Sequence, residues 1–257
     1  MRTLVTSALV SATLVFAAFS ANAAGYCDQL PNSAALKSAL SQAQQKANGG
    51  LGLNMWGSIV DRTGRVCAVV YTGKDAGSQW LGSRLISAQK ANTANAFSLD
   101  GLALSSANLF APTQPGGSLY GLQASNPLNV PVAYSKKGSL SNFGTKKDPL
   151  VGEFIGGVNV FGGGLALYND EGKVVGAVGV SGDTSCADHN IAWRTRNSLN
   201  LDYVTAGISA DNNDQIVYDI TNGTSKGDFG HAKCGDKVGD ALADLPKTRV
   251  VTGKTAE

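Results

Sequence analysis

Two segments far apart in the chain carry the same hairpin pattern, and this pattern limits the chain to folds that contain an antiparallel sheet. The first is NMWGSIVDRTGRVCAVVY, at residues 54–71, and the second is LALYNDEGKVVGAVGV, at residues 165–180. In each, two runs with a period of two flank a short polar loop that closes on a glycine, Gly64 or Gly172. A glycine at this place suits the left-handed position of a tight turn. Both hairpins are therefore predicted to belong to one sheet.

Helical periodicity flanks both hairpins. Residues 32–47 have apolar residues at helical spacing and end at a glycine pair, and residues 76–97 read as a longer helix whose small residues allow close packing on the sheet. A third helix is predicted after Val180, where residues 183–185 are all suitable N-caps; Ser185 with Asp188 resembles a capping box. The order helix, hairpin, helix, hairpin, helix predicts a single α+β domain.

Two regions lack this periodicity. Residues 112–160 form a long loop with several aromatic residues, which is either an ordered lid or binding wall, or disordered. From about residue 206 the chain becomes polar and rich in glycine. We therefore predict a domain over residues 24–205 and a C-terminal extension over residues 206–257.

The N-terminus predicts export. Residues 1–23 combine an early arginine, an apolar stretch and an Ala-Asn-Ala ending, which is typical of a cleavable signal peptide. The expected location is the periplasm or the extracellular medium, and no later segment is predicted to span a membrane. The formal net charge is only +2 and basic residues form no cluster larger than a pair, so nucleic acid is not an expected partner.

Four cysteines lie in the predicted mature chain, and an oxidising compartment favours two disulfides. Four cysteines permit three pairings. We prefer Cys27 with Cys67 and Cys186 with Cys234, because each bond would tie a terminal segment to a core element. The spacing contains no CxxC pair, so it does not predict a zinc or redox site.

Two segments carry a resemblance to a known family. SAQKANTANAF, at residues 87–97, and GGGLALYNDEGKVVGAVGVSGD, at residues 162–183, resemble the GlcG/HbpS family of haem-binding and haem-related proteins, whose fold also occurs in the C-terminal domain of PduO-type proteins. The resemblance implies an antiparallel sheet of about five strands with helices packed on its faces, haem or a related tetrapyrrole as ligand, and a homo-oligomer. Ala88 stands where a basic residue is expected, and residues 164–166 lack the usual proline.

A haem site would need an axial ligand. His189 and His231 are the candidates for the iron, while Trp193 could lie against the ring and Arg196 could pair with a propionate. The alternative is structural: if Cys186 bonds to Cys234, the tethered tail packs over the same stripe of the third helix.

A second candidate site involves Lys90. If the long loop folds over its helix, Lys90 could bind a ligand carboxylate in a pocket lined by Tyr120, Trp80 and Phe97. The alternative is a solvated lysine on an exposed helix face.

The sequence thus favours an exported small-molecule-binding protein, with haem or a related tetrapyrrole as ligand, over an enzyme, and no catalytic residue is assigned. Two alternatives stay open. One is an enzyme acting on a small organic acid or on haem breakdown, using Lys90, Arg196 and His189. The other is an oligomeric sensory or structural partner protein without catalysis.

Overall fold

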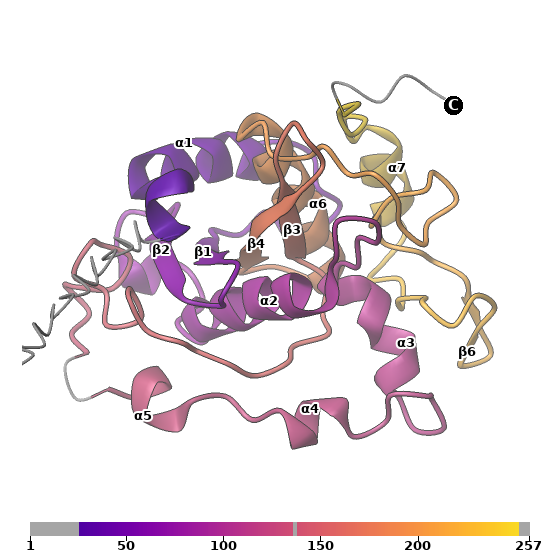
Figure 1. Cartoon of the computed structure of the whole chain (residues 1–257), viewed down its shortest axis with the longest axis horizontal. Coiled ribbons are helices and arrows are strands. Elements are labelled where there is room, and N and C mark those ends of the chain that lie inside the picture. Colours follow the sequence, from indigo (N-terminus) through magenta and orange to yellow (C-terminus); the bar gives the residue numbers. More distant parts are fainter. Residues whose placement is uncertain (1–25, 136–137, 252–257) are drawn as a thin grey trace, which may run out of the picture.

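A four-stranded antiparallel sheet forms the centre of the fold (Figure 1). The computed structural model describes residues 26–135 and 138–251, so the predicted signal peptide lies outside the described residues. The strand order is β2-β1-β4-β3. The strands are β1 (Trp56–Asp61), β2 (Val66–Tyr71), β3 (Gly164–Tyr168) and β4 (Val174–Ser181). The two predicted hairpins are confirmed, and β1 joins them by pairing with β4.

The predicted count of about five strands is wrong by one for the described central sheet. After β4 the chain enters a helix, and its return to the sheet edge makes a single parallel bridge, between Tyr168 and Asp202. Asn200, with φ of 57°, turns the chain just before this bridge. A separate two-stranded ribbon, β5 (Ile220–Thr221) and β6 (Thr224–Ser225), lies outside the central sheet.

Helices cover both faces of the sheet. On one face, α1 (Ser33–Gln44) and α6 (Ser185–Ser198) share an apolar core with strand residues such as Ile59 and Val178. On the other face, α2 (Ser83–Phe97) packs its buried alanines against Val60 and Ala177. The contact is close: a Cβ added to Gly179 of β4 would lie 1.9 Å from the backbone oxygen of Ser87.

The helix predicted from residue 76 is divided. A short 3-10 turn, η2 (Ala76–Ser78), comes first, and α2 begins only at Ser83. Asp75 and Ser78 form a capping box around η2, and Gln79, which follows it, is extended. This local hydrogen bonding ends the turn before the long helix starts.

The described residues of the long segment, 112–135 and 138–160, form a layer packed against α2 (Figure 1). The segment follows η3 (Ser106–Leu109), overlaps the end of α3 (Phe110–Thr113) and contains α4 (Leu122–Ser125) and α5 (Val130–Ala133). Leu150 and Ile155 are buried in the same apolar cluster as the α2 alanines, and Asp148 forms a buried ion pair with Arg84.

Two disulfides fasten the ends of the described chain. Cys27, in η1 (Tyr26–Gln29), bonds to Cys67 of β2, and Cys186 of α6 bonds to Cys234. This is the pairing that the sequence favours. Beyond Cys234, α7 (Val238–Ala243) packs against α6. Within the described residues, no helix has the length and apolar character needed to cross a membrane.

Candidate functional site

The first turn of α6 sets the position of the predicted stripe. Thr184 is the N-cap, and its hydroxyl accepts from the Ala187 N–H at 3.3 Å. The predicted capping box between Ser185 and Asp188 is wrong, because the N-cap is Thr184, one residue earlier. The Asp188 carboxylate instead accepts from the Asp183 N–H at 2.9 Å. This start turns the predicted stripe of α6 toward the protein interior. Its four residues, Cys186, His189, Trp193 and Arg196, are all buried.

Arg196 is paired inside the protein through its two terminal nitrogens, while its Nε has no hydrogen-bond partner among the described residues. Its two terminal nitrogens each donate to one carboxylate oxygen of Asp214 at 2.7 Å, and one also donates to the Ala166 carbonyl at 3.0 Å. The guanidinium carbon lies 4.8 Å from the Trp193 ring centre. The side chains of Arg196 and Asp214 have no solvent access, since both are 0% exposed. A ligand propionate would therefore have to displace Asp214 to reach Arg196.

His189 is also held within the core. Its Nε2 accepts from the Ile216 N–H at 3.0 Å, while its Nδ1 has no hydrogen-bond partner among the described residues. Burial lowers the pKa of His189 well below 6.5, with Arg196 and His231 adding to the effect, so the ring is neutral. The Trp193 indole nitrogen donates to the Pro246 carbonyl at 2.8 Å.

His231 lies near this stripe but makes its own contacts. Its Nδ1 is 2.7 Å from the Ala232 carbonyl oxygen, and its Nε2 is 3.3 Å from the Ser185 hydroxyl. Its ring centre lies 4.7 Å from that of Phe110, with the two planes tilted by 44°. Burial lowers the pKa of His231 to about 4, although the bond to Ala232 acts in the opposite direction. Both predicted iron ligands are thus neutral and buried, and each Nε2 has a protein partner.

Lys90 does not face solvent or the long loop. It is 2% exposed, and its Nζ donates to Asp188 at 2.7 Å and to the Val180 carbonyl at 3.2 Å. Tyr120 is 69% exposed, so the predicted pocket that joins it to the buried Lys90 does not form. Burial raises the pKa of Asp188 to about 6, and Lys90 opposes this rise.

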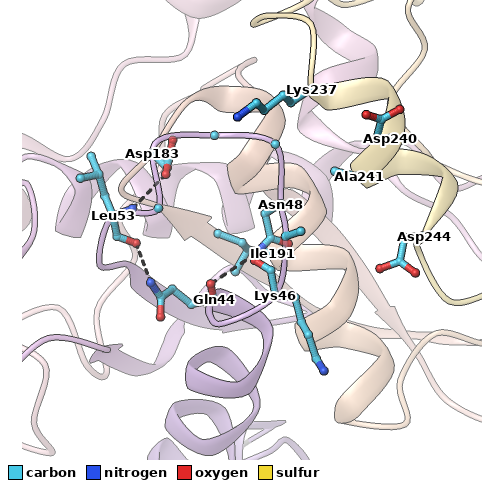
Figure 2. Close-up of a pocket in the computed structure, with 14 residues that line it drawn as sticks. Gln44, Lys46, Asn48, Leu53, Asp183, Ile191, Lys237, Asp240, Ala241 and Asp244 are labelled. Carbon is cyan, nitrogen blue, oxygen red and sulfur yellow. Dashed lines mark hydrogen bonds between the residues drawn. The ribbon is translucent and has the colours of Figure 1, made fainter.

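The structure places a cavity of about 550 Å³ on the opposite side of α6 from this stripe, and we call it the α6–α7 cavity (Figure 2). Its walls are the loop after α1, the start and middle of α6, and α7. The lining residues are Gln44, Lys46, Ala47, Asn48, Gly49, Gly50, Gly52, Leu53, Asp183, Ile191, Lys237, Asp240, Ala241 and Asp244. The volume lies within the range of small-molecule sites.

Asp183 holds the loop wall of the cavity in place. Its carboxylate accepts from the backbone N–H groups of Leu51 at 2.8 Å and Leu53 at 3.1 Å, and also from Thr184. Gly50 packs so closely on this carboxylate that an added Cβ would lie 2.3 Å from it. Asp183 is therefore a structural group, and its charge is already satisfied by loop amides.

Two lysines stand at opposite ends of the cavity mouth. Figure 2 shows Lys237 beside the start of α7 and Lys46 beside the end of α1. Both are exposed, and neither ammonium group has an ion-pair partner among the described residues. On the α7 side, Asp244 pairs with Arg194 at 3.1 Å. The free cations would suit ligand carboxylates.

The cavity was not predicted from the sequence. The glycine pair at residues 49 and 50 indicated only the end of a helix, and the contact with α7 comes from a segment far along the chain. The lining residues include no histidine, cysteine, methionine or tyrosine. The cavity thus offers apolar surface, the two unpaired lysines and the exposed carboxylate of Asp240, which has no ion-pair partner among the described residues. It offers none of the usual axial ligands of haem iron.

Two solved structures resemble this chain. A Klebsiella pneumoniae protein, ORFY of the DUF336 family, is 24% identical, with 66% of this chain and 90% of that chain covered and a TM-score of 0.43. A PduOC:heme complex is also 24% identical, with coverage of 65% and 91% and a TM-score of 0.44. No curated protein is similar enough to count as a match.

The sequence of residues 32–196 matches the family described as "Haem degrading protein HbpS-like". This span begins at the N-cap of α1 and ends within α6, so it contains all four strands of the central sheet, α1, α2 and most of α6. The chain therefore belongs to the HbpS-like family.

Proposed function

We propose that this protein binds haem or a related tetrapyrrole in the α6–α7 cavity. Membership of the HbpS-like family supports the ligand class, and the PduOC:heme complex is a protein of similar sequence with haem bound. The observation that carries the proposal for this site is the pair of unpaired lysines at the mouth of a largely apolar cavity. A tetrapyrrole combines a planar apolar ring with carboxylates, and this cavity has partners for both parts.

The chain's own residues would hold the ligand in two ways. Ile191, Leu53 and Ala241 supply apolar contacts for the ring. Lys46 and Lys237 supply point charges for the carboxylates, and flexible exposed lysines can adjust to their spacing. The Asp183 clamp keeps the loop wall ordered before the ligand arrives, which lowers the entropy cost of binding.

Iron ligation by the predicted histidines does not fit this arrangement. His189 is 0% exposed and its Nε2 is engaged by Ile216, and His231 bonds to Ala232 and Ser185. Haem bound in the cavity would therefore be held by ring and carboxylate contacts, with no axial ligand from the lining residues. It follows that iron contributes little to the affinity.

A spectroscopic titration tests this proposal. Hemin and metal-free protoporphyrin are titrated separately into the oxidised protein, and we expect saturation near one equivalent with affinities within about tenfold of each other, which is about 1.4 kcal/mol. The double variant Lys46→Glu, Lys237→Glu should weaken both ligands at least tenfold. The matched control is Lys146→Glu, Lys147→Glu, which changes two exposed lysines elsewhere by the same charge and should leave binding unchanged.

Three results would overturn the proposal. Unsaturable uptake would remove the binding function itself. Equal loss in the cavity variant and the control would show only a general charge effect. Hemin binding at least a hundredfold tighter than that of protoporphyrin, and lost in His189→Ala, His231→Ala, would move the site to the predicted stripe.

The proposed setting is outside the cytoplasm. We take residues 1–23 as a cleaved signal peptide, residues 24–205 as the ligand-binding domain and residues 206–257 as a tethered extension. The two disulfides support an oxidising compartment, either the periplasm or the medium. An N-terminus at Ala24 in protein purified from that fraction would support this, and an uncleaved Met1 would refute it. The homo-oligomer stays a prediction, which light scattering would check.

A further inference from the structure

A second cluster of reactive groups lies at the start of α6. The sulfur atoms of Cys186 and Cys234 and an imidazole nitrogen of His231 all lie within 4.8 Å of one another. The Ser185 hydroxyl adjoins them, at 3.3 Å from Nε2 of His231 and 3.4 Å from the Cys234 sulfur. This cluster has no part in the proposed tetrapyrrole site.

The hydrogen bonds of His231 indicate which of its two nitrogens has a lone pair that could bind a metal ion. The Ala232 carbonyl can only accept a hydrogen bond, so Nδ1, at 2.7 Å, carries the proton and donates it. Nε2 then has a free lone pair, to which the Ser185 hydroxyl donates. A histidine whose Nδ1–H donates to a backbone carbonyl is the usual arrangement of a metal-ligating histidine, because the second bond orients the ring.

The surroundings of Cys234 favour its thiolate form. Its sulfur accepts from the Cys186 N–H at 3.2 Å, lies beside the Ser185 hydroxyl, and sits at the N-terminus of the 14-residue helix α6. Donors and a helix N-terminus both stabilise a thiolate. Cys234 is partly exposed while Cys186 is fully buried, so an external thiol can reach the Cys234 sulfur.

We propose that reduction of the Cys186–Cys234 disulfide creates a zinc site formed by both thiolates and Nε2 of His231. An external dithiol supplies two electrons and two protons, its own sulfurs form a disulfide, and the Cys186–Cys234 bond becomes two thiols. Zn²⁺ then replaces the two thiol protons. The fourth position goes to the Ser185 hydroxyl or to water. The oxidised protein has no such site, so binding depends on redox state.

The geometry allows the change without moving the backbone far. Tetrahedral zinc with bonds of about 2.3 Å to sulfur and about 2.1 Å to nitrogen places ligand atoms about 3.5–3.8 Å apart. The imidazole nitrogen already lies within 4.8 Å of both sulfurs, so mainly the two sulfurs must separate. The zinc then takes over the role of the disulfide in holding the extension on α6.

The other disulfide provides an internal comparison. Cys27 and Cys67 lie near Asp61, but this carboxylate already accepts from the Thr63 and Arg65 N–H groups at 2.8 and 3.0 Å. No imidazole belongs to that group. We therefore expect zinc to prefer the Cys186, Cys234 and His231 cluster.

The test uses the full mature chain reduced with a phosphine, because a dithiol reductant would compete with the protein for zinc. Zn²⁺ is titrated against a chromophoric chelator in wild type and in the Cys27→Ser, Cys67→Ser variant, and we expect one equivalent bound in the variant only after reduction. His231→Asn keeps a donor for the Ala232 carbonyl and removes the Nε2 ligand, so it should weaken binding at least tenfold. Co²⁺ should show thiolate charge-transfer bands, and its d–d bands should shift in His231→Asn.

A measurement on wild type covers the case in which the serine variant fails to fold. Zinc should protect Cys186 and Cys234, but not Cys27 and Cys67, from alkylation, as peptide mass spectrometry resolves each pair. Unchanged zinc affinity in His231→Asn would overturn the proposal, since a thiol pair alone would then suffice. Equal protection of both pairs, or a reduced chain that stays unfolded with zinc, would overturn it as well.

Discussion

Mild acid is expected to destabilise the fold through His231. Burial lowers the pKa of this ring from 6.5 to about 4, so between these values the unfolded chain binds a proton that the folded chain does not. The contribution of His231 to the free energy of unfolding is therefore fully present above pH 6.5 and is lost as the pH falls toward 4. At about 1.4 kcal/mol per pH unit, the gap corresponds to about 3 kcal/mol in the free energy of unfolding.

Urea unfolding of wild type and His231→Asn at pH 7, 6, 5 and 4.5 measures this effect. The difference in free energy between the two proteins should fall by about 2 kcal/mol from pH 7 to pH 4.5, which is most of the expected total. His189, whose pKa is also lowered, and Asp188, whose pKa is raised, are present in both proteins and cancel. A difference that stays constant within about 0.5 kcal/mol would refute the reasoning, because His231 would then titrate alike in both states.

Three further predictions concern the buried groups and the close helix contact. Asp214→Asn leaves the Arg196 charge buried without its partner, and urea unfolding should show a loss of about 3–5 kcal/mol; a loss below about 1 kcal/mol would contradict the pairing. Lys90→Met should cost more stability at pH 8 than at pH 5, because Asp188 can become neutral only in acid; a pH-independent loss would contradict this. Gly179→Ala should lower the melting temperature strongly, whereas Gly82→Ala, with nothing within 4 Å of the new Cβ, should not; equal shifts would contradict the packing argument.

The elements of this fold were predictable because their signals are local. The period-two runs around Gly64 and Gly172 define both hairpins, and the structure places both glycines at positive φ, 90° and 73°. That the described central sheet has four strands and not five was not predictable from the same kind of signal. Whether residues near Asp202 extend the sheet depends on Asn200, Asn197 and Arg249, whose side chains hold that segment by contacts distant in sequence.

The candidate site was harder to predict because exposure is a tertiary property. The sequence pattern is typical of a surface lysine at Lys90. The side chain is buried in the structure because its ion-pair partner, Asp188, lies 98 residues later in the chain. The α6–α7 cavity needs α7 to reach the loop after α1, and no sequence pattern indicates that contact. The proposed zinc site was not predicted from the sequence for a similar reason. Its third ligand, His231, joins two cysteines whose sequence separation of 48 resembles no metal-binding motif.

The C-terminal extension explains why the α6 stripe is closed. The match to the HbpS-like family ends at residue 196, but the partners of the stripe come later: Asp214 for Arg196, Ile216 for His189, Pro246 for Trp193 and Cys234 for Cys186. Each of the four stripe residues thus has at least one hydrogen-bond, ion-pair or disulfide partner in the C-terminal extension. Any ligand that used the stripe would have to displace the extension while Cys186–Cys234 still tethers it. The α6–α7 cavity needs no such displacement, because α7 of the extension forms one of its walls.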